Sequence, residues 1–138
     1  MTTIKEDYCS YEVAKLLKEK GFNEFCYTYY DGIDNSINRF DKGLHFKNTS
    51  YPWGVPYDVS KAKKYIITPT HQMAMKWLRK IHNISIEPFV DFGSGDEHWW
   101  TADVAYIKKD GLIDELCGYN SYEEAAEAGI KYCLENLI

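Results

Sequence analysis

Cysteine and histidine are the side chains of this sequence best suited to act as nucleophiles, general bases or metal ligands. They are Cys9, Cys26, Cys117, Cys133, His45, His71, His82 and His98. No Cys-x-x-Cys pair and no His-Glu-x-x-His motif occurs, and His71 and His82 lie three turns apart on one expected helix, too far to share an ion. We therefore predict no metal site, no cofactor and no catalytic residue.

Serine and phosphate-binding motifs are equally sparse. Ser94 lies between two glycines, but it lacks the Gly-x-Ser-x-Gly spacing of a nucleophile elbow and is typical of a hairpin turn. No glycine-rich phosphate loop is present. One enzymatic alternative stays open, in which Cys9, just before the first expected helix, forms a dyad with His45 or His98 that the fold would have to bring together.

The charges are unevenly distributed along a chain of 138 residues whose formal net charge is −5. Residues 59–86 contain six Lys and Arg and no acid, whereas residues 110–138 contain seven acids and one Lys. The simpler interpretation is that the two regions neutralise each other. The alternative is that a basic helix face, made of Lys76, Arg79 and Lys80, binds nucleic acid, although the acidic pI near 5.3 argues against it.

Aromatic residues make up 16% of the chain, with 12 Tyr, 6 Phe and 4 Trp. Tyr and Trp join a large apolar body to a polar tip, which suits protein interfaces. A loop containing Tyr51, Trp53 and Tyr57 either plugs the core or recognises a partner. Trp99 neighbours Trp100 on one expected strand, so the two indoles point to opposite faces. Exposure of Trp99 beside Tyr27 or Tyr29 would create an apolar patch for a partner.

Three segments have helical periodicity, and each begins at a capping hydroxyl. The first extends from Ser10 to about Gly21, the second from about Pro69 to His82, and the third from Tyr122 to Leu137. Met73, Trp77, Leu78 and Ile81 form the expected apolar stripe of the second helix. Ser121 and Glu124 have the spacing of a capping box.

Strand patterns lie between the helices. They cover residues 24–30, 44–47, 64–67, 85–92, 98–108 and about 112–116, with polar loops expected at 31–43 and 48–60. Gly93 to Asp96 predicts a hairpin turn, and Pro88 predicts an edge strand or bulge. The strand at 64–67, the second helix and the strand at 84–90 suggest a right-handed crossover.

The pattern as a whole predicts a single α+β domain spanning residues 1–138. An antiparallel or mixed sheet of about four or five strands would pack against two or three helices. The N-terminal residues lack the apolar core of a secretory signal and no apolar run is long enough to span a membrane, so we expect a cytoplasmic protein with reduced thiols.

Three stretches of sequence carry a resemblance. The sequence resembles short uncharacterised proteins encoded by bacteriophages and mobile elements of gut anaerobic bacteria. The stretches that carry this resemblance are Thr68 to Arg79 with Ile81 to Ile84, Ser10 to Phe22, and Ser121 to Gly129. The resemblance covers most of the chain except its middle. It implies a cytoplasmic, phage-associated accessory role, and it brings no functional residues.

The leading hypothesis is therefore a non-enzymatic accessory protein that binds another protein, or forms a homo-oligomer, through an aromatic surface. Its candidate residues are Tyr51, Trp53, Tyr57, Trp99, Tyr27 and Tyr29. Nucleic-acid binding through Lys76, Arg79 and Lys80 is the second hypothesis, and a small enzyme with a site not visible in the sequence is the third.

Overall fold

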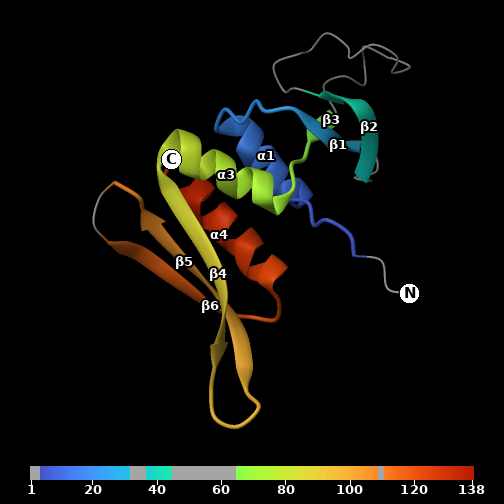
Figure 1. The fold of residues 1–138 in the computed structure, drawn as a ribbon. Helices are drawn as coiled ribbons and strands as arrows, with labels where there is room; N and C mark the ends of the chain where they lie inside the picture. The colour runs from blue at the N-terminus through green and yellow to red at the C-terminus, as the bar shows by residue number, and fades with distance from the viewer. Residues whose placement is uncertain (1–3, 32–36, 45–64, 109–110) are drawn as a thin grey trace. The chain divides into compact units, whose positions relative to one another are not determined.

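The computed structural model describes residues 4–31, 37–44, 65–108 and 111–138, drawn in colour in Figure 1. The chain divides into two compact units. The N-terminal unit is Tyr8–Pro69, and the C-terminal unit joins Met1–Asp7 to Thr70–Ile138. Each unit contains a three-stranded antiparallel sheet and at least one helix, so the predicted α+β class is confirmed.

In the N-terminal unit, helix α1 (Tyr11–Glu19) begins where the sequence predicts. The Ser10 hydroxyl accepts a hydrogen bond of 3.2 Å from the Val13 N–H and so satisfies one of the free donors of the first turn. Gly21 takes a positive φ of 90°, which lets Phe22 fold back and donate its N–H to the Leu17 carbonyl. Phe22 and Leu17 are consequently buried in this unit's core.

The sheet of the N-terminal unit has the order β2-β1-β3, with β1 at Cys26–Asp31, β2 at Ile37–Leu44 and β3 at Tyr65–Ile67. The loop expected at residues 31–43 is therefore wrong at residues 37–43, which pair with β1, while residues 32–36 lie outside the described ranges. Backbone pairing needs no apolar side chains on the solvent side of an antiparallel sheet, so polar composition was a poor guide there.

The C-terminal unit has the element order α3 (His71–His82), β4 (Ile84–Phe92), β5 (His98–Tyr106), β6 (Leu112–Tyr119) and α4 (Tyr122–Asn136). Its strands form a meander in the order β4-β5-β6. The predicted hairpin between β4 and β5 is confirmed, since the Gly93 N–H donates to the Glu97 carbonyl and the Glu97 N–H donates to the Ser94 carbonyl. Pro88 does lie on an edge strand.

Both helices of this unit contact each other and pack against the sheet, α4 across all three strands and α3 against β4 (Figure 1). Gly129 allows α4 to approach closely, since a Cβ at that position would lie 2.7 Å from Ile86 Cγ2. The Ser121 hydroxyl accepts from the Glu124 N–H, as predicted. The Glu124 carboxylate in turn accepts a hydrogen bond from the Asn120 N–H, instead of from the N–H of Ser121.

Two expectations about the sheet are corrected. The described strands form two sheets instead of one, with β3 in the first and β4 in the second. The right-handed crossover from β3 through α3 to β4 therefore does not exist. A three-residue strand can pair in either sheet, and local sequence does not distinguish the two. The assignment of residues 1–138 to one domain stays a prediction.

Candidate functional site

The predicted aromatic residues fall into three groups. Tyr51, Trp53 and Tyr57 lie outside the described residues. Tyr27 and Tyr29 are on β1 of the N-terminal unit, whereas Trp99 is on β5 of the C-terminal unit. Trp99 therefore does not share a sheet with either tyrosine.

Alternation along β1 and the residue before it creates an aromatic face, which consists of Phe25, Tyr27 and Tyr29. Cys26 and Thr28 point to the opposite face and are both 5% exposed. Phe25 is 60% exposed and Tyr27 is 52% exposed, while Tyr29 is half-buried. Two of the three rings therefore present most of their surface to solvent.

The basic face of α3 consists of Lys76, Arg79 and Lys80, which are all exposed. Their spacing of three and four residues places them on one side of the helix. Within the described ranges, none of the three forms an ion pair with a carboxylate. The two contacting helices α3 and α4 thus leave this basic face without direct neutralisation.

The apolar stripe expected on α3 is rotated in the structure. Trp77 and Leu78 are buried as predicted, but Met73 and Ile81 are 37% and 58% exposed. His71 is buried on the inward face instead, at 6% exposure. The apolar stripe expected from the sequence did not include His71, so its burial was not predicted.

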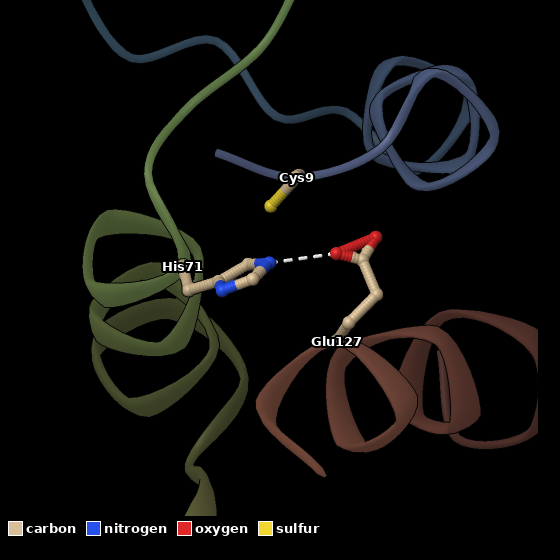
Figure 2. A group of neighbouring side chains, drawn as sticks. All are labelled: Cys9, His71 and Glu127. Carbon is tan, nitrogen blue, oxygen red and sulfur yellow. Dashed lines mark hydrogen bonds and ion pairs between the residues drawn. The ribbon is translucent and has the colours of Figure 1, made fainter. Parts of the chain in front are cut away.

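His71 forms a short hydrogen bond within the C-terminal unit. Its Nε2 lies 2.7 Å from Oε2 of Glu127 on α4, and Figure 2 shows the imidazole edge pointing at that carboxylate. Spacing could have revealed the residue, because His71, Ala74, Met75 and Leu78 follow an i, i+3, i+4, i+7 pattern and are all buried. The partner Glu127 could not be predicted from spacing, because it lies on a different helix, α4.

The geometry limits what His71 and Glu127 can do. A neutral imidazole that donates from Nε2 to Glu127 leaves Nδ1 as an acceptor, and Nδ1 is buried with no hydrogen-bond partner among the described residues. The pair is best understood as a polar contact that holds α3 against α4.

A pocket of about 120 Å³ lies at the N-terminal ends of α3 and α4. Its lining comes from the segment 5–7, from Thr70, His71 and Gln72, and from Tyr122 and Glu123. Gln72 donates to the Tyr122 hydroxyl at 2.8 Å. The lining mixes Lys5 with Glu6, Asp7 and Glu123, so its charge does not select an anion or a cation.

The described thiols with perturbed acidity are poor nucleophiles. Burial raises the pKa of Cys133 to about 12, and burial with the nearby Glu24 carboxylate raises the pKa of Cys26 to about 12. Both stay protonated at neutral pH. The dyad alternative is untested, because Cys9 and His98 belong to different units and His45 lies outside the described residues.

No family model, curated protein or solved structure matches this chain. Among the helices of the described ranges, none has both the length and the apolar character needed to cross a lipid bilayer.

Proposed function

We propose that this protein is a non-enzymatic, cytoplasmic accessory protein that binds another protein, or a second copy of itself, through the aromatic face of the N-terminal unit. The supporting observation is the exposure of Phe25 and Tyr27, at 60% and 52%, on one side of a sheet whose other side is buried. The resemblance to phage-encoded proteins suggests the accessory role.

The physical reason is the contrast between the two sides of β1. Rings of this size are among the residues whose burial contributes most to association, and Tyr is enriched at the energetically dominant positions of interfaces. A partner that covered both rings would remove apolar area from water while leaving the Tyr27 hydroxyl able to hydrogen-bond at the rim.

The test replaces both rings and compares the variant with a matched one. We expect the variant Phe25→Ser/Tyr27→Ser to bind its partner about tenfold or more weakly. Sedimentation velocity measures this loss if the partner is a second copy of the chain. Recovery of a co-purifying protein from cells of the source organism measures it if the partner is another protein. The control is Phe92→Ser/Ile81→Ser, which removes apolar side chains that are 73% and 58% exposed in the other unit. Equal behaviour of the two variants and the parent protein would contradict the proposal.

Nucleic-acid binding by the basic face of α3 is the second candidate, supported by the exposure of Lys76, Arg79 and Lys80 without carboxylate partners among the described residues. We expect the parent protein to retain a labelled oligonucleotide at low salt. The variant Lys76→Gln/Arg79→Gln/Lys80→Gln should not retain it. The control removes three exposed lysines of the N-terminal unit, Lys15, Lys18 and Lys20. Absence of retention at low salt would eliminate this candidate.

A further inference from the structure

The outer face of the β4-β5-β6 sheet, opposite the side on which α4 packs, carries acids in register. Glu87 on β4 and Glu115 on β6 each pair directly with Asp103 on the central strand β5. Directly paired residues point to the same face with their Cβ atoms about 5 Å apart. We call Glu87, Asp103 and Glu115 the acidic row.

Nothing in the three strands balances this charge. The strands contain no Lys and no Arg, and Asp91 adds a fourth acid to the same face. Within the described residues, no cation forms an ion pair with any of these carboxylates. Burial, together with Glu87 and Asp91, raises the pKa of Asp103. Like charges placed opposite each other destabilise a sheet, and such local conflicts concentrate where a surface has a function.

Two buried polar atoms on the same face have no hydrogen-bond partner among the described residues. Thr101, two residues from Asp103 on the same face, is fully buried, and its Oγ1 has no hydrogen-bond partner among the described residues. Asp103 Oδ1 is likewise buried without a described partner. Buried polar atoms are nearly always hydrogen-bonded, so these two oxygens keep unused acceptor capacity beside the acidic row.

Two aromatic rings border the acids on this face. Phe89 pairs with Thr101, and Trp99 pairs with Asp91; both rings are half-buried. The Trp99 ring lies against the hairpin turn, since its Cζ3 would be 3.0 Å from a Cβ placed on Gly93. A guanidinium group can stack on such a ring and bond a carboxylate at the same time, which neither a lysine ammonium nor a metal ion does as well.

We propose that this face binds a partner-protein segment that bears more than one arginine, with the acidic row accepting hydrogen bonds from one guanidinium and Trp99, which lies opposite Asp91, stacking against another. The charge complementarity of the face, which has four acids and no base, selects this occupant. The surface belongs to the C-terminal unit and uses none of the residues of the aromatic face, so this inference does not depend on the proposed function.

The experiment measures fluorescence anisotropy of labelled octa-arginine and octa-lysine peptides with the whole chain, at low and at physiological ionic strength. We expect octa-arginine to bind more tightly than octa-lysine. The variant Glu87→Gln/Asp103→Asn/Glu115→Gln should weaken octa-arginine binding about tenfold or more. Trp99→Leu should abolish the preference for arginine over lysine.

The matched control is Glu12→Gln/Glu19→Gln/Glu24→Gln, which makes the same change in net charge with three exposed acids of the N-terminal unit. It should alter binding by less than about twofold. Folding is a minor concern for the acidic-row variant because it removes repulsion, and far-UV circular dichroism checks it.

Four results would overturn the inference. The first is a lack of octa-arginine binding at low salt. The second is equal weakening of binding by the control and by the acidic-row variant, which would indicate attraction to net charge alone. Calcium chloride at matched ionic strength could displace the peptide stoichiometrically, which would make the face a metal site. Loss of concentration-dependent self-association in the acidic-row variant would make the occupant a second copy of the chain.

Discussion

The central strands of the two sheets, β1 in the N-terminal unit and β5 in the C-terminal unit, alternate between a buried face and a more exposed one. Cys26 and Thr28 are buried on β1, as Ala102 and Val104 are on β5. The other faces differ, because Phe25 and Tyr27 expose rings on the first sheet and Asp103 stands among acids on the second.

The contrast shows that similar strand architecture leaves the chemistry of the outer face free to vary. The inner faces must satisfy packing against helices, so both consist of small and apolar groups. The outer faces have no such constraint, and their composition therefore carries the information about partners. One face is suited to apolar contact, and the other is suited to a cation.

Thiol reactivity offers the largest expected effect with which to sharpen this comparison. Cys26 and Cys133 each have a pKa raised by burial from 9.0 to about 12, whereas Cys117 is exposed on β6. Burial shields Cys26 and Cys133 from reagents and their raised pKa keeps them protonated, so Ellman's reagent should modify the exposed Cys117 orders of magnitude faster than either. Mass spectrometry of digested samples locates the modified residue. Rapid native-state modification of Cys26 or Cys133 would show that the corresponding core opens readily.

The helices of the two units also differ in composition. Helix α4 contains Gly129, which allows its close approach to the sheet, whereas α1 contains no glycine. Gly129→Ala should destabilise the protein by about 1–3 kcal/mol, because the new methyl group would overlap Ile86 Cγ2. The better helix propensity of alanine offsets up to about 1 kcal/mol of this cost. Urea unfolding followed by circular dichroism measures the change.

The control for that prediction uses Ile86→Ala, which removes the obstructing methyl group. In this background Gly129→Ala should no longer be destabilising, and a double-mutant cycle gives the coupling. Equal costs in both backgrounds would show that the contact between α4 and β4 does not limit the approach.

Repulsion within the acidic row has the smallest expected effect. The raised pKa of Asp103 means that the folded state binds its proton more readily than the unfolded state, so stability falls as the pH rises from the ordinary Asp value through the raised one. Asp103→Asn should therefore stabilise the protein at pH 7 by about 0.5 kcal/mol. The gain should vanish below the ordinary pKa of Asp, near 3.8.

Thermal unfolding across the pH range measures this effect. Asp96→Asn, in the exposed hairpin turn, should show no comparable gain at neutral pH. A destabilising effect of Asp103→Asn at pH 7 would mean that the carboxylate is held by favourable interactions, which would remove the electrostatic contrast between the two sheets.

Local features of the fold could be predicted because they depend on neighbours in sequence. The caps at Ser10 and Ser121 and the hairpin after β4 act over three or four residues. The exposure of the basic face of α3 also follows from helical spacing. That Trp99 and Tyr27 belong to different sheets could not be predicted, because it depends on which strands pair.

The sequence by itself determined the α+β class, the starts of the helices and the set of aromatic and charged residues available to a partner. Only the tertiary structure decided that β3 and β4 join different sheets, that His71 meets Glu127, and that Glu87, Asp103 and Glu115 stand in one row. These arrangements link residues tens of positions apart. Their free energy comes from strand register and helix packing, neither of which leaves a local signal in the sequence.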